Sequence, residues 1–132
     1  IPERVVKEII SQKAKKSLEL LIEKEIVRSC NDGKEEIFSF LQNRFPMLDD
    51  GELTVISIAY ENKNCFAIID EYLGRNIAEK LELNLKGVFG ILLELYKSKK
   101  ITKERLTKTC RKIDKSNFRI NFEEIGYEWV IK

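Results

Sequence analysis

The fold class of this chain is indicated most clearly by the stretch Cys65-Phe66-Ala67-Ile68-Ile69-Asp70-Glu71. Its first part is a continuous apolar run, and two carboxylates end it. Such a run is typical of a central strand in a parallel sheet, buried on both faces. Helical patterns lie on both sides of it along the chain, and strands that alternate with helices indicate a parallel sheet. The stretch therefore predicts a layered α/β domain.

Apolar residues at helical spacing dominate the chain before this strand. They predict helices over residues 2–13, 15–24, 34–45 and about 50–62. Pro46 ends the third helix, and Asp49 or Asp50 can cap the fourth. Between the helices, Ile26-Val27 is a candidate strand, and Asn31-Asp32-Gly33 is a turn signal.

The same alternation continues after the strand. Helices are predicted over about 73–81, from Gly87 to about Ser98, and over about 103–114 with Thr102 as the cap. Asn84-Leu85-Lys86 is a second short strand, residues 118–120 are extended or loop, and Phe122, Ile125 and Trp129 mark a terminal helix. No linker or repeat interrupts the pattern, and 132 residues suit one domain. We expect a single domain over residues 1–132.

Composition and charge exclude several classes of protein. A net charge of only +2 means that any footprint for nucleic acid must be local. The basic segments are residues 97–100 and 103–115, which can equally be solvated helix faces. The absence of histidine removes Ser-His-Asp and Cys-His mechanisms and every His-ligated metal site. The three cysteines show no metal-binding or disulfide spacing, which suits a reducing cytoplasm, and no apolar run is long enough to span a membrane.

Glu52 is the acidic residue whose position is hardest to explain as surface charge. On a helix starting at Asp50, it falls in the middle of the apolar arc, between Ala59 and Ile56. A buried carboxylate costs several kcal/mol unless it is paired, protonated or bound to a metal. The alternative is that Glu52, in the first turn, leans outward and favours the helix dipole.

Three further acidic residues and one arginine are candidates for the same site. Asp70 and Glu71 follow the apolar strand, and ligands gather at the carboxyl ends of strands in open α/β sheets. Asp70 can instead cap the next helix. Glu8 borders the apolar face of its helix and can be a surface residue. Arg75 can hold a phosphate or pair with an acidic neighbour. Together these oxygens suit Mg²⁺ or Mn²⁺, and two such ions can catalyse phosphodiester hydrolysis.

A family resemblance extends over nearly the whole chain. It is carried by Ile1-Pro2-Glu3 with Val6 and Glu8, by Gly51-Glu52, Ile58-Ala59, Ile68-Ile69-Asp70-Glu71, residues 74–78, Leu83 and residues 87–93, and by Phe118-Arg119-Ile120. These segments resemble a PIN-domain subfamily of nucleic-acid-binding proteins related to toxin–antitoxin ribonucleases. The part between Gly51 and residue 93 is the most specific.

The resemblance implies a three-layer α/β/α sandwich with a short parallel sheet and an acidic pocket that binds Mg²⁺ or Mn²⁺ and cleaves RNA. Glu8, Glu52 and Asp70 would be the catalytic metal ligands, with Glu71 as a fourth. Arg75 and Lys86 would hold the phosphate backbone. A homodimer and a partner antitoxin are implied as well.

One element of the family pattern has no counterpart here. The family places an aspartate at the end of an N-terminal strand, and the sequence starts at Ile1-Pro2, without a Met. We therefore expect that this strand is missing, which would weaken metal binding. Two alternatives stay open: a non-catalytic PIN-like module that binds RNA or protein, and an unrelated α/β interaction domain with acidic caps.

Overall fold

The computed structural model of this chain describes residues 1–116, 118, 120, 122 and 125–132. The chain forms two compact units, Ile1–Lys86 and Gly87–Lys132. Each unit has its own buried apolar cluster. The single domain expected from the sequence stays a prediction.

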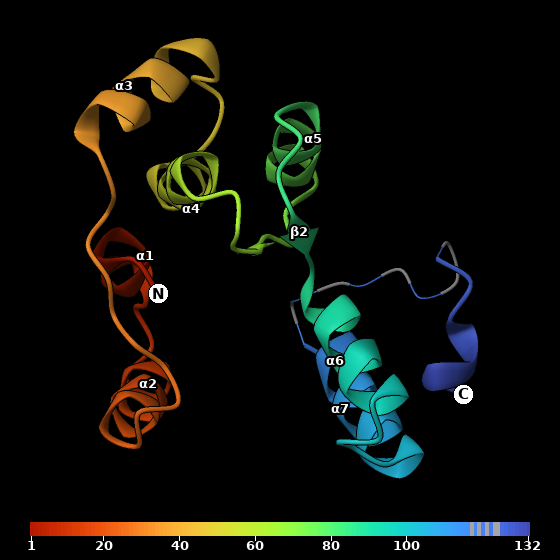
Figure 1. The fold of residues 1–132 in the computed structure, drawn as a ribbon. Helices are drawn as coiled ribbons and strands as arrows, with labels where there is room; N and C mark the ends of the chain where they lie inside the picture. The colour runs from red at the N-terminus through yellow and green to blue at the C-terminus, as the bar shows by residue number, and fades with distance from the viewer. Residues whose placement is uncertain (117, 119, 121, 123–124) are drawn as a thin grey trace. The chain divides into compact units, whose positions relative to one another are not determined.

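The first unit alternates helices with a small sheet (Figure 1). Its elements are α1 (Glu3–Glu8), α2 (Gln12–Glu23), α3 (Glu35–Arg44), α4 (Asp50–Glu61), β1 (Ala67–Ile68), α5 (Tyr72–Lys80) and β2 (Leu85–Lys86). β1 and β2 pair in parallel, with Ala67 opposite Leu85, and α5 connects them. The predicted α/β fold with a short parallel sheet is therefore confirmed.

The N-terminal helices differ from the prediction. The prediction of one helix over residues 2–13 is wrong, because α1 ends at Glu8 and α2 begins at Gln12. The Ser11 hydroxyl accepts from the Ala14 N–H at 3.4 Å, so a cap signal ends one helix and starts the next. The candidate strand at Ile26-Val27 does not form; a parallel bridge instead joins Pro2 to Cys30.

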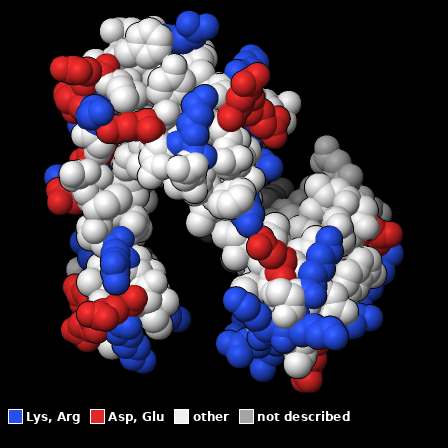
Figure 2. Space-filling view, viewed as in Figure 1, with Lys and Arg blue, Asp and Glu red and all other residues white. Residues whose placement is uncertain are grey.

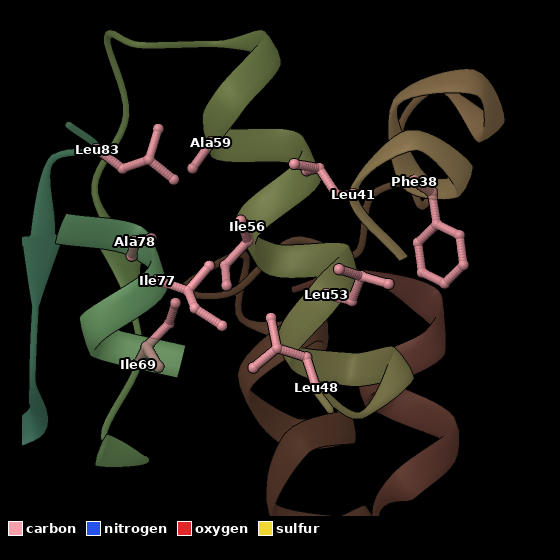
Figure 3. Packing of buried hydrophobic residues seen from close by; sticks show 11 residues of the cluster. Phe38, Leu41, Leu48, Leu53, Ile56, Ala59, Ile69, Ile77, Ala78 and Leu83 are labelled. Atoms are coloured by element: carbon pink, nitrogen blue, oxygen red, sulfur yellow. The ribbon is translucent and has the colours of Figure 1, made fainter. Parts of the chain in front are cut away.

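Helix α4 is the centre of the first unit's core. Its buried residues Leu53, Ile56 and Ala59 belong to one apolar cluster with residues of α3, β1 and α5. Figure 3 shows α4 passing between side chains of α3 and side chains of α5. The Asp49 carboxylate caps α4 by accepting from the Glu52 N–H at 2.7 Å. The core and the cap together fix where the first turn of α4 lies.

Strand β1 is covered on one face only. Ala67 and Ile69 are buried against the core, whereas Phe66 and Ile68 are 56% and 55% exposed. The exposed face lines an open apolar groove of about 510 Å³ that also includes Pro2 and Val5. The prediction of a strand buried on both faces is therefore wrong. An apolar run alone does not show whether both faces are covered.

The second unit is a helical hairpin with a short C-terminal turn. It contains α6 (Val88–Lys97), α7 (Lys103–Asp114) and the 3₁₀ turn η1 (Glu128–Val130). Its buried residues are Phe89, Leu106, Cys110, Phe122 and Val130. The Thr102 cap on α7 is confirmed by a 3.2 Å bond from the Arg105 N–H.

The chain's C-terminal segment is only partly described. Where an α-helix was predicted, the described residues contain only η1, and residues 123–124 lie outside the description. Phe118 and Ile120 are in irregular structure, as expected, while Arg119 is outside the described residues. No helix among the described residues is long and apolar enough to cross a membrane.

Candidate functional site

The Glu52 carboxylate lies where one of its oxygens has no hydrogen-bond partner in the described part of the chain. Glu52 is in the first turn of α4, and its side chain is half-buried. Its Oε1 atom is buried and has no hydrogen-bond partner among the described residues. An unpaired buried polar atom costs about 1–3 kcal/mol, and more when it is charged. Helical periodicity predicts that Glu52 lies on the apolar face of its helix, and the structure buries one of its oxygens there.

Two glycines leave room for the carboxylates of this site. A Cβ atom built on Gly74 of α5 would lie 2.8 Å from Glu52 Oε1 and 3.0 Å from Ile69 Cγ2. A Cβ atom built on Gly51 would overlap both carboxylate oxygens of Glu8. Helices α1, α4 and α5 therefore meet here with carboxylates packed directly against bare backbone, beside the end of β1.

Arg4 holds α1 in the position that brings Glu8 to α4. Its backbone N–H donates to the Asp32 carboxylate at 2.8 Å, and its guanidinium pairs with Glu35 at 3.0 Å. The guanidinium carbon also lies 3.9 Å from the centre of the Phe38 ring. These contacts join α1 to the turn before α3 and to α3 itself, which explains why the short α1 keeps its place.

Like charges surround Glu52. Burial is the largest cause that raises the pKa of Glu52 above its usual range, followed by the carboxylates of Asp49, Glu71 and Glu8. Carboxylates from α1, from the cap of α4 and from the residue before α5 thus all act on Glu52 in the first turn of α4. A carboxyl group whose pKa is raised by burial together with charged neighbours is a candidate for a functional site.

Asp70 lies near the end of β1, as expected from the sequence. It is separated from β1 by Ile69 alone and is half-buried. The structure therefore brings the charges of Glu8 and Glu71 close enough to act on Glu52, and the role of Asp70 in the site stays a prediction.

The two residues predicted to hold phosphate have other contacts. The Arg75 guanidinium donates to the Ile69 carbonyl at 3.0 Å, and so ties α5 to the end of β1. The Lys86 ammonium lies 4.1 Å from the centre of the Phe66 ring. Both side chains are half-buried in the first unit. Their role toward phosphate stays a prediction.

Asp49 is the member of the cluster that sequence reasoning missed. The sequence predicts Asp49 as a helix cap, a role that the structure confirms. A cap three residues before Glu52 is also a charge beside it, because residues three apart share one helix face. That spacing was the signal available in the sequence.

The donor chemistry of the cluster fits a hard divalent cation. All of its donors are carboxylate oxygens, and the unpaired Glu52 Oε1 lacks a positive partner. Within the described residues, no three acidic or cysteine side chains form a ready-made metal site. Mg²⁺ keeps several waters and takes one or two carboxylates plus substrate phosphate, so a partial carboxylate set is sufficient for it.

The fold and the cluster together define an α/β domain with an acidic site where the end of α1 meets the starts of α4 and α5, beside a parallel sheet. A family model described as a PIN domain matches residues 1–127, and the chain belongs to the PIN-domain family. The PIN domain is a nuclease-type fold, and its members generally use divalent metals. Comparison with curated proteins and with solved structures gave no match.

The raised pKa of Glu52 predicts that its contribution to stability falls as pH rises. Below the usual glutamic acid pKa of about 4.3, the folded and unfolded chains both hold its proton. Above that value the unfolded chain releases the proton first, so stability declines until pH passes the raised folded pKa. Glu52→Gln removes this decline. Urea unfolding of both proteins without metal should show a stability advantage of the variant that grows with pH in this window, and a constant difference would contradict the assignment.

Gly74→Ala tests the close approach of Glu52 to α5. The added methyl group must displace the Glu52 carboxylate or Ile69, because the Cβ would lie 3.0 Å or less from each. We expect the affinity of the cluster for a divalent cation, measured by titration with Mn²⁺, to fall about tenfold or more, because supporting residues are worth 10–100-fold in metal affinity. Gly90→Ala in α6 is the control, because its Cβ meets nothing within 4 Å. That change should stabilise the chain by about 0.5–1 kcal/mol and leave the affinity for Mn²⁺ unchanged.

Proposed function

We propose that this protein is a metal-dependent endoribonuclease that cleaves RNA phosphodiester bonds. The observation that carries the proposal is the buried, unpaired Glu52 oxygen, which is surrounded by the carboxylates of Asp49, Glu71 and Glu8. A fold that only needed stability would replace Glu52 with an apolar residue, because the carboxylate there is costly. The chain belongs to a nuclease-type family, and in a nuclease a buried carboxylate can serve as a metal ligand.

Glu52 and Glu8 are the residues that would hold Mg²⁺ or Mn²⁺, with Glu71 and Asp70 as further ligands. When bound, the metal supplies positive charge for the phosphate oxygens and lowers the pKa of water for attack on phosphorus. The chain's own groups set the conditions for that binding. Glu52 must release its proton first, so the raised pKa makes metal affinity increase with pH.

RNA is the substrate that the family membership favours. Arg75 and Lys86 are proposed to orient its backbone near the carboxyl end of β1. The role as a toxin, the partner antitoxin and the homodimer stay predictions of the sequence resemblance.

The direct test is cleavage of a labelled single-stranded RNA by the purified chain. We expect fragments in Mn²⁺ or Mg²⁺ and none in excess EDTA. Cleavage that continues in EDTA would contradict a metal-dependent mechanism. RNA binding that survives EDTA, with no cleavage under any metal condition, would support the non-catalytic binding module instead.

A further inference from the structure

Basic residues gather in one segment of the second unit. Between Lys97 and Lys115 the chain has nine Lys and Arg residues against two acidic residues, Glu104 and Asp114. This excess is larger than the net charge of +2 for the whole chain, so the rest of the molecule is net acidic. Figure 2 shows Lys and Arg side chains gathered over the part of the chain that holds α6 and α7. Because the net charge of the chain is low, a surface that binds a polyanion must be locally basic, and this segment is.

The two faces of α7 have different surroundings. Leu106 and Cys110 are fully buried in the second unit's own core. Lys108, Lys112 and Lys115 are exposed, and none of them forms an ion pair within the described part of the chain. They line an open depression of about 650 Å³ along the helix, together with Lys103 and Arg111. Glu104 lines it as well, so the depression has one acidic residue against five cations. Cations in excess on one helix face repel one another, and an anionic ligand relieves that repulsion.

An aromatic side chain stands beside this basic face. The Lys103 ammonium lies 5.2 Å from the centre of the Trp129 ring, and Trp129 is 38% exposed. Tyr96 and Tyr127 lie against the same indole, with ring centres 6.4 and 6.5 Å away. These rings hold Trp129 in place, so its exposed part is a preorganised surface rather than a freely rotating side chain. Aromatic surfaces beside cations are what single-stranded nucleic acids use for base stacking.

We propose that α7 and Trp129 form a binding surface for single-stranded nucleic acid, separate in the chain from the acidic cluster. The lysines of α7 contact the phosphate backbone, and a base stacks on Trp129. The 12 residues of α7 span about 18 Å, which matches roughly five nucleotides at about 3.4 Å each. The proposal rests on RNA as the substrate of the proposed nuclease, and it assigns RNA binding to a surface outside the Arg75 and Lys86 pair.

A membrane surface fits these observations less well. Helices that lie on membranes insert an apolar face, and the apolar face of α7 is already buried against its own unit. The Trp129 ring is held by neighbouring rings, so it is suited to stacking rather than to insertion. Nucleic acid therefore accounts for both the charge and the aromatic residue.

The test compares two double variants of the full chain that remove the same charge. Lys108→Gln/Lys112→Gln neutralises α7, and Lys13→Gln/Lys16→Gln neutralises exposed lysines of α2. Binding of a labelled single-stranded RNA is followed by fluorescence anisotropy in EDTA at several salt concentrations. We expect the α7 variant to bind at least about fivefold more weakly and its log–log salt slope to fall by about 1.4, since each phosphate contact contributes about 0.7. Equal effects of the two variants, or no effect of either, would overturn the proposal.

Trp129 provides a second readout because it is the chain's single tryptophan. Base stacking should quench its fluorescence when RNA is added, whereas polyphosphate, which has no bases, should bind without that quenching. RNA binding without any change in tryptophan emission would overturn the stacking part of the proposal. Stronger binding of phosphatidylserine vesicles than of RNA, lost in the α7 variant, would overturn the choice of nucleic acid.

These measurements also separate this inference from the proposed nuclease. Binding in EDTA does not require cleavage. RNA binding through α7 without metal-dependent cleavage would therefore contradict the nuclease proposal and leave the α7 proposal intact. Metal-dependent cleavage by the wild-type chain, together with unchanged RNA binding by the α7 variant, would contradict the α7 proposal and leave the nuclease proposal intact.

Discussion

Replacing Glu52 with Gln is expected to lower metal-dependent RNA cleavage by more than about 100-fold. Even residues that only support a metal ligand are worth 10–100-fold, and Glu52 is proposed as a ligand itself. Gln has nearly the same shape, so it fits against Gly74 without the charge that a cation requires. The measurement is the initial rate of RNA cleavage in Mn²⁺ at neutral pH.

The control for this variant is Glu19→Gln on α2. Glu19 is exposed, so Glu19→Gln makes the same chemical change at a surface position. The Glu19 variant should keep the wild-type rate. The Glu52 variant should keep its circular dichroism spectrum and be at least as stable, because a neutral side chain relieves the repulsion from Glu8, Asp49 and Glu71. A fully active Glu52→Gln protein would rule out the proposed site.

Leu53→Ala is expected to have the largest effect on stability, about 2–5 kcal/mol in the free energy of unfolding. Leu53 is fully buried, and α4 touches α1, α3, α5 and β1, so a cavity there affects every element around the site. Urea unfolding followed by far-UV circular dichroism measures the change. It should appear as a lower midpoint with an unchanged slope.

Leu20→Ala is the matched change on a surface helix, because Leu20 is 54% exposed. It should cost well under 1 kcal/mol. A similar loss in the two variants would mean that the cluster around α4 is not the core of the first unit.

Local signals in the sequence predicted most of the helices well. α3, α4, α5 and α7 lie within one or two residues of their expected ranges. The caps Asp49 and Thr102 were both anticipated, because a capping side chain acts on the backbone two or three residues away. Such signals need no knowledge of the rest of the fold.

Features that depend on distant parts of the chain were harder to predict. The exposure of Ile68 depends on what covers β1, which an apolar run does not reveal. The break between α1 and α2 depended on Ser11, which the apolar spacing of residues 2–13 concealed. In both cases the sequence pattern was compatible with two structures, and packing or a local cap selected one.

The candidate site shows the same division. Glu52 was identified from helical periodicity, a local property of α4. The meeting of Glu8 with α4 depends on the contact at Gly51, and the meeting of Glu52 with α5 depends on Gly74. Neither glycine carries a sequence signal for a partner so far along the chain, so within the sequence only the family resemblance links these residues.

Binding of manganese shows whether the cluster around Glu52 holds a divalent cation. Electron paramagnetic resonance of free Mn²⁺, titrated with the chain at neutral pH and without RNA, measures that affinity alone. We predict Mn²⁺ binding by the wild-type chain and by Glu19→Gln, and at least tenfold weaker binding by Glu52→Gln. Equal Mn²⁺ affinity in all three proteins, or no binding by the wild-type chain, would contradict the assignment of the site.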